Sequence, residues 1–199
     1  MLIFKDNENQ HYVFIHIPKC CGTYIREQIM SNPNYSICKK YWDHESTGSD
    51  LAHIPYMYRD NYIDKDINYN FVAFTRNPYH RFISAYNNRL AHIKEHYNDS
   101  QITFKSFILT KLTTIFNEND DGRVVHFYPQ YLFVINKQHF PECKTYKLET
   151  YNDEIIPLND FYIKPYWLSQ YFDNETLAVF NKFYEKDFIY FNYEMIHTI

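Results

Sequence analysis

The chain of 199 residues has the length of one ordinary domain and is long enough to bury a core by itself. Its composition, 45% hydrophobic and 20% aromatic, excludes a disordered or low-complexity chain. The formal net charge of -4 gives no whole-molecule attraction to nucleic acid, although a local basic pocket for a small anion is compatible with it. We therefore expect one domain over residues 1–199 with no nucleic-acid partner.

Hydropathy and cysteine usage bear on the compartment. No apolar run approaches the roughly 18 to 20 residues that a membrane span needs, and the first ten residues are not signal-like. We therefore expect a soluble, cytoplasmic protein. Cys20, Cys21, Cys38 and Cys143 form no C-x-x-C pair, which favours thiols in a reducing compartment over a disulfide framework or a zinc site.

The first half of the chain predicts two strand-to-helix units. Residues 12–17 (YVFIHI) predict a strand, followed by a tight loop and then by a helix from about Tyr24. Little periodicity follows until residues 71–75 (FVAFT), which predict a second buried strand. Asn77 and Pro78 are typical of a helix start. The apolar side of this helix is expected to pack on the sheet.

The second half predicts further elements of both kinds. They are a helix over 104–116 ended by a turn at 119–122, strands over 131–135 and 145–148, and a helix from 175 to about 186 capped by Asp173 or Asn174. Strands that alternate with helices indicate an α/β fold with a mostly parallel central sheet. Ligands bind such sheets beyond the carboxyl ends of the strands.

One motif, residues 16–24 (HIPKCCGTY), lies between a predicted strand and helix. Backbone N–H groups and the helix dipole at such a position favour an anion, and Lys19 and Thr23 add a charge and a hydroxyl. The loop is not a Walker A sequence, because Lys19 precedes the only glycine of the loop, Gly22. A turn without a ligand explains the same composition.

A second motif, residues 74–86 (FTRNPYHRFISAY), follows the second strand. Arg76 lies at the end of the strand and Ser84 two turns into the next helix. A guanidinium and a hydroxyl placed in this way suit a phosphate group. Taken alone, a strand-terminal arginine is equally typical of a structural ion pair.

Together the two motifs resemble the I-P-K-x-x-G-T and R-N-P-x-x-R-x-x-S-x-Y segments of sulfotransferases that use 3′-phosphoadenosine 5′-phosphosulfate (PAPS). The carbohydrate branch, which includes heparan sulfate 2-O-sulfotransferases and chondroitin sulfotransferases, is the most similar. Residues 126–130 (HFYPQ), 147–149 (KLE) and 183–188 (FYEKDF) are similar to further segments of that branch. The resemblance implies a three-layer, P-loop-like nucleotide-binding fold.

The resemblance also implies donor-binding residues. Those for the 5′-phosphosulfate are in the first motif: Lys19, Cys20, Cys21, Gly22, Thr23 and Tyr24. Arg76 and Ser84 would hold the 3′-phosphate. Cys20 and Cys21 replace the usual Thr and Gly, and the loss of a Gly narrows the allowed backbone geometry. Adjacent thiols at a helix N-terminus are also candidates for reactivity.

Sulfuryl transfer needs a base for the acceptor hydroxyl and a cation at the leaving oxygen. Lys19 suits the second role. His53 is the first candidate for the base, because related enzymes place an active-site histidine between the two donor segments. The alternatives are His126, His44 and His16. Arg81, Tyr86 and Glu149 are secondary candidates that would shape the site.

These motifs favour the prediction that the protein is a PAPS-dependent O-sulfotransferase that acts by in-line displacement. Its acceptor would carry a hydroxyl and would above all be a glycan, and the reaction would need no metal. Protein-tyrosine sulfation and a catalytically silent glycan- or partner-binding module are the alternatives. A nucleotide kinase is disfavoured by the missing Walker A loop. Related animal enzymes carry a membrane anchor, whereas we expect no membrane span or signal in this sequence, so we expect a bacterial or viral origin. The sequence leaves the oligomeric state open.

Overall fold

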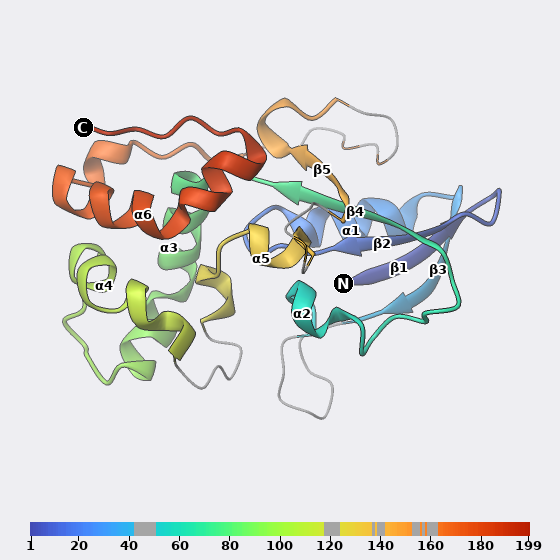
Figure 1. Cartoon of the computed structure of the whole chain (residues 1–199), viewed down its shortest axis with the longest axis horizontal. Coiled ribbons are helices and arrows are strands. Elements are labelled where there is room, and N and C mark those ends of the chain that lie inside the picture. Colours follow the sequence, from blue (N-terminus) through green and yellow to red (C-terminus); the bar gives the residue numbers. More distant parts are fainter. Residues whose placement is uncertain are drawn as a thin grey trace. The chain divides into compact units, whose positions relative to one another are not determined.

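The structure is a computed structural model, which describes residues 1–41, 51–117, 124–136, 138, 142–152, 156, 158 and 163–199. The chain divides into two compact units (Figure 1). The first comprises Met1–Arg76 with Gln130–Ile163, and the second Asn77–Pro129 with Lys164–Ile199. The single domain expected from the chain length stays a prediction, because compact units of one chain need not fold independently.

The first unit contains a five-stranded mixed sheet in the order β3-β1-β2-β4-β5. The strands are β1 (Leu2–Asp6), β2 (His11–Ile15), β3 (Tyr35–Lys40), β4 (Tyr69–Thr75) and β5 (Lys144–Lys147). β2 pairs with β4 and β4 with β5 in parallel, whereas β1 pairs with β2 and β3 antiparallel. The predicted α/β fold is confirmed, as are the predicted strands at β2, β4 and β5.

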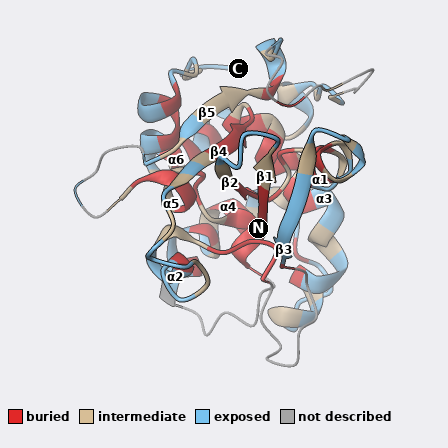
Figure 2. Ribbon diagram, turned by 90° about the vertical axis from the view of Figure 1, so that its right-hand side faces the viewer, coloured by how far each residue is buried: buried red, intermediate tan, exposed pale blue. Residues whose placement is uncertain are grey.

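Two strands lie outside the sequence prediction. β1 is buried over Leu2–Phe4, and β3 is exposed along most of its length at the edge of the sheet (Figure 2). A turn joins β1 to β2, in which the Asp6 carboxylate accepts hydrogen bonds from the N–H groups of Glu8 and Gln10, both at 2.9 Å. β3 shows no alternation of apolar residues because it covers no core, so sequence periodicity does not reveal it.

Helices of the first unit follow the strands closely. α1 (Gly22–Ser31) comes directly after the loop that ends β2, as predicted, and contacts β3. The prediction of a strand at 131–135 is wrong: residues Tyr131–Val134 form the short helix α5, which contacts α2 (Tyr56–Arg59). A short apolar run has no periodicity that separates a buried strand from a buried turn of helix.

The second unit is helical. Its elements are α3 (Pro78–His96), α4 (Phe104–Thr110), α6 (Asn174–Phe191) and the 3-10 helices η1 (Leu112–Asn117), η2 (Val125–Phe127) and η4 (Leu168–Gln170). The helix predicted over 104–116 is therefore an α-helix followed by a 3-10 helix, and its predicted terminal turn at 119–122 lies outside the described residues. The last helix runs five residues beyond its predicted end.

Aromatic side chains form the core of this helical unit. The fully buried Phe82 of α3 packs its ring against Phe104, Phe107, Phe127 and Phe180 among others. The sequence predicted that the apolar side of α3 packs on the sheet. The structure corrects this, since the buried side chains of that face cluster with those of α4, η1, η2 and α6. Amphipathic periodicity identifies the buried face of a helix and not its partner.

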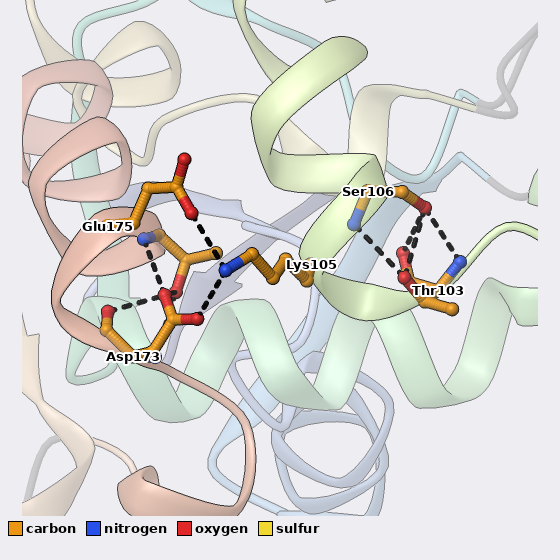
Figure 3. Close-up of polar contacts among 6 residues, drawn as sticks. Thr103, Lys105, Ser106, Asp173 and Glu175 are labelled. Carbon is orange, nitrogen blue, oxygen red and sulfur yellow. Dashed lines mark hydrogen bonds and ion pairs between the residues drawn. The ribbon is translucent and has the colours of Figure 1, made fainter.

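Side-chain caps start the helices of this unit. The Asn77 side chain accepts from the N–H groups of Tyr79 and His80, which confirms the predicted start of α3. Thr103 and Asp173 form capping boxes at α4 and α6. Figure 3 shows Lys105 between the two boxes, with Nζ 2.6 Å from Asp173 and 2.7 Å from Glu175.

Candidate active site

The two sequence motifs meet at one edge of the sheet. β2 and β4 are parallel neighbours, with Ile15 opposite Ala73. The carboxyl ends of adjacent parallel strands lie side by side, so the loop after β2 and the residue after β4 emerge together. This is the edge at which open α/β sheets bind ligands.

The loop after β2 takes two left-handed turns that a glycine would make without strain. Lys19 has a φ of 65° and Cys21, the N-cap of α1, a φ of 55°. The Cys21 side chain makes no capping hydrogen bond, and the first turn of α1 carries no acidic residue. The amide end of this ten-residue helix therefore keeps its preference for an anion.

Gly22 is required by close packing. A Cβ built on Gly22 would lie 1.8 Å from Cδ2 of His16, well inside van der Waals contact. His16 is itself buried at the end of β2. The glycine therefore allows the histidine ring to lie directly against the first turn of α1.

Arg76 leaves β4 beside this loop. Its side chain is 5% exposed, and its guanidinium lies 3.5 Å from the carbonyl oxygen of Lys19. Since a guanidinium only donates hydrogen bonds, it supports the left-handed turn at Lys19 as well as adding positive charge. Arg76 and Lys19 thus come from motifs 57 residues apart in sequence and lie in contact.

Gln130 is a site residue that sequence reasoning missed. Its side-chain amide is fully buried and bonds to both the N–H and the C=O of Arg76. The amide oxygen also accepts from the thiol of Cys20. The available signal was its position as the last residue of the segment at 126–130 (HFYPQ), which was noted only as supporting the resemblance.

The charged groups close to Cys21 are those that shift the pKa of its thiol. Burial raises the pKa of the Cys21 thiol, while the cations Arg76 and Lys19 lower it and Glu149 raises it further. The net effect is a raised pKa, which opposes the expectation of a reactive thiolate at this helix N-terminus. All four cysteines lie within the described residues and carry thiols.

His53, the first candidate for the base, lies beside the same loop. It is buried, and its ring packs against that of His16 with the centroids 4.2 Å apart. Nδ1 of His53 lies 2.8 Å from the carbonyl oxygen of His16. Because a carbonyl only accepts, the neutral His53 ring carries its proton on Nδ1 and its lone pair on Nε2.

His126 and Arg81 belong to the second unit. Arg89 donates to Nε2 of His126, so the lone pair of this imidazole accepts a hydrogen bond from a cation. Arg81 donates to the carbonyl oxygens of His126 and Tyr128 at 3.0 and 2.8 Å and lies over the ring of Tyr184. Arg81 therefore holds the backbone of η2.

The predicted site residues fall into three groups. The first unit brings together Lys19, Cys20, Cys21, Gly22, Arg76 and His53, with Glu149 close enough to act on the Cys21 thiol. Thr23 is exposed and Tyr24 half-buried in the first turn of α1. Ser84, Tyr86, Arg81 and His126 lie in the second unit, and the role of Ser84 stays a prediction. His44 lies outside the described residues.

Two further features were searched for in the part of the chain that the structure describes. None of its helices is both long and apolar enough to cross a membrane. Nor do three or more His, Cys, Asp or Glu side chains gather there in a group suited to a metal ion.

The fold is that of an α/β protein whose Lys19 and Arg76 meet at the carboxyl ends of two parallel strands. A family model described as the sulfotransferase family matches residues 3–161, and the chain belongs to this family. It is a sulfotransferase, an enzyme of sulfuryl transfer. No curated protein matches it significantly, and neither does any solved structure.

Proposed function

We propose that the protein transfers the sulfuryl group of PAPS to a hydroxyl of a carbohydrate acceptor. The observation that carries the proposal is the contact between the Lys19 loop and Arg76 at the carboxyl ends of β2 and β4. A donor with two separate phosphate-bearing positions needs two cationic positions, and these two motifs supply them.

The loop supports binding of the 5′-phosphosulfate. The N–H groups that open α1 and the Lys19 ammonium present donors and positive charge to one anion. Arg76, with a guanidinium suited to bidentate contact, supports binding of the 3′-phosphate. Cys20 and Cys21 leave the backbone donors of the loop in place, so the departure from the family's Thr and Gly does not remove them.

The same residues support the chemistry. PAPS supplies an activated sulfuryl group with a phosphate as its leaving group. Lys19 stabilises the negative charge that grows on that phosphate as the bond to sulfur breaks. His53, with its lone pair on Nε2, takes the proton of the acceptor hydroxyl, and its Nδ1–H bond to His16 holds the ring in the required tautomer.

The acceptor class rests on the resemblance of five sequence segments to the carbohydrate branch of the family. Carbohydrate hydroxyls have high pKa values, so their attack requires a base within hydrogen-bonding reach. A buried histidine with a fixed tautomer suits this requirement.

A thermal-shift experiment tests the donor. Adenosine 3′,5′-bisphosphate should stabilise the protein by about 2.7 kcal/mol at a hundred times its dissociation constant, and ATP with Mg²⁺ much less. In Arg76→Ala the affinity for the bisphosphate should fall by roughly 1.5 to 3 kcal/mol through loss of a charge-assisted contact. Equal stabilisation by ATP with Mg²⁺ would point to a kinase instead.

Transfer of label from [³⁵S]PAPS tests the acceptor. Incubation with a panel of desulfated glycans should yield labelled carbohydrate, while tyrosyl peptides in parallel reactions should remain unlabelled. Labelled peptide with unlabelled glycan would contradict the carbohydrate assignment and leave the donor assignment intact.

A further inference from the structure

Gln130 extends the pairing of the sheet by one residue through its side chain. The ladder between β4 and β5 ends at Thr75 and Lys147, so Arg76 lies just beyond the paired part of β4. There the Gln130 amide accepts from the Arg76 N–H at 2.9 Å and donates to the Arg76 carbonyl oxygen at 2.9 Å. A side-chain amide thus takes the place of a neighbouring strand and fixes both backbone polar groups of Arg76.

The same amide reaches the first motif. Its oxygen accepts a second hydrogen bond from the Cys20 thiol, with Sγ 3.3 Å away. Cys20 directly follows Lys19 and directly precedes the N-cap of α1. One fully buried side chain therefore contacts the backbone of the proposed 3′-phosphate ligand and the loop of the proposed 5′-phosphosulfate site.

We propose that Gln130 is a positioning residue that sets the separation of Lys19 and Arg76 to match the two charged groups of the donor. The proposal rests on the function proposed above. An amide suits this position, since it donates to the carbonyl of Arg76 and accepts from two donors at its oxygen while carrying no charge at any pH. The orientation of Lys19 and Arg76, which are proposed to bind the two anionic groups of the donor, then depends on Gln130, which contacts neither of these groups.

The replacement Gln130→Glu tests this with a pH readout. The protonated carboxyl has the shape of the amide and also both donates and accepts, whereas the ionised form has no donor for the Arg76 carbonyl. The ionisable groups around it, Cys20 and Arg76 beside the side chain and Lys19, Cys21 and Glu149 around the loop, are the same in the wild type. The dissociation constant of Gln130→Glu for adenosine 3′,5′-bisphosphate, divided by that of the wild type at the same pH, therefore reports the effect of the introduced carboxyl alone.

At neutral pH we expect Gln130→Glu to weaken binding of adenosine 3′,5′-bisphosphate about 10- to 100-fold relative to the wild type, and Gln130→Met, which has no such bonds, to weaken it similarly. As the pH falls and the carboxyl takes up a proton, the ratio for Gln130→Glu should return toward one. The ratio for Gln130→Met should stay constant. A purely structural role would not produce this difference.

Phe133→Leu is the matched control, since Phe133 is a buried residue of the adjoining helix α5. It should lower the melting temperature and leave the affinity of the folded protein unchanged. Folded Gln130 variants that bind as tightly as the wild type, or a Gln130→Glu ratio that does not recover at low pH, would overturn the proposal. A wild type that does not bind the bisphosphate would instead refute the proposed function.

Cys20→Ala keeps the proposal testable should the Gln130 variants not fold. It removes the thiol that donates to Gln130 and leaves the amide bonded to Arg76. The loss of one hydrogen bond should weaken binding about 2- to 10-fold. Unchanged affinity in Cys20→Ala would contradict a role of Gln130 in holding the loop.

Discussion

The ring nitrogens of two candidate bases, His53 and His126, make different hydrogen bonds. His53 donates from Nδ1 to a backbone carbonyl, whereas His126 accepts at Nε2 from Arg89. A general base needs a lone pair directed at its substrate, and an arginine bonded to that lone pair competes for it. The assignment of His53 as the base, with His126 as the alternative, stays a prediction that mutagenesis can test.

His53→Ala and Lys19→Ala separate the two proposed roles. His53→Ala should lower turnover by about 10² to 10⁴ and leave binding of adenosine 3′,5′-bisphosphate almost intact. Lys19→Ala should reduce both turnover at saturating donor and donor affinity, because its charge acts in the bound and in the transition state. Steady-state kinetics with a working acceptor and calorimetric titration of the bisphosphate measure the two effects.

His126→Ala serves as the comparison in these assays, and circular dichroism confirms that each variant is folded. The wild-type rate should also fall at acidic pH, since a cationic imidazole accepts no proton. Near-normal turnover in His53→Ala would exclude His53 as the base. A large loss of turnover in His126→Ala alone would assign the role of base to His126.

Cys21 takes the left-handed backbone conformation at the start of α1. This conformation costs an L-residue about 1 to 2 kcal/mol, and glycine avoids most of that cost while losing about 0.5 to 1 kcal/mol through its freer unfolded chain. We therefore expect Cys21→Gly to raise the free energy of unfolding by up to about 1 kcal/mol. Urea unfolding of the reduced protein measures it.

Cys21→Ala is the control for the lost thiol, since alanine keeps the Cβ that causes the strain. It should be no more stable than the wild type. If Cys21→Gly were the less stable of the two variants, the strain at this position would be refuted.

At the scale of elements, one exposed lysine joins the starts of α4 and α6. The Lys105 ammonium and the N–H of Thr176 hold the pKa of the Asp173 carboxyl below its ordinary value. A carboxyl whose pKa is lowered by folding stabilises the protein above its unfolded pKa, and the contribution is lost as the pH falls through the folded value. This ion pair therefore stabilises the folded protein at neutral pH, and its contribution to stability decreases as the solution becomes acidic.

Asp173→Asn isolates the charge, because asparagine is also a good N-cap. The wild type should melt at a higher temperature than the variant at about pH 7, and the difference should shrink toward about pH 3 and in concentrated salt. Scanning calorimetry across this range checks the trend. A difference that is independent of pH would show that the charge contributes nothing.

The helix starts that local capping signals set agree with the sequence predictions, whereas the helix at 131–134 does not. The starts of α3 and α6 are predictable because Asn77 and Asp173 bond to N–H groups two or three residues away. The helix at 131–134 follows Gln130, whose side chain bonds to a residue 54 positions earlier in the chain. No local pattern contains that contact.

At the scale of the molecule, each compact unit has buried hydrophobic residues of its own, and the expected single domain predicts that both unfold together. Phe82→Leu removes ring contacts in the helical unit and should cost roughly 1 to 3 kcal/mol. Hydrogen exchange should then show equal losses of protection in α6 and in β4. A loss confined to α6 would show that the units unfold independently.

The sequence by itself determined the fold class and the family and proposed most members of the candidate site, because strand-to-loop-to-helix motifs are local and their chemistry is read directly from residue types. Only the tertiary structure decided how those members meet. Parallel pairing of β2 with β4 brings Lys19 to Arg76, and the buried amide of Gln130 bonds to Arg76 and to Cys20, the residue after Lys19. Such contacts depend on strand order and register, which residues far apart in the chain settle jointly and no single segment encodes.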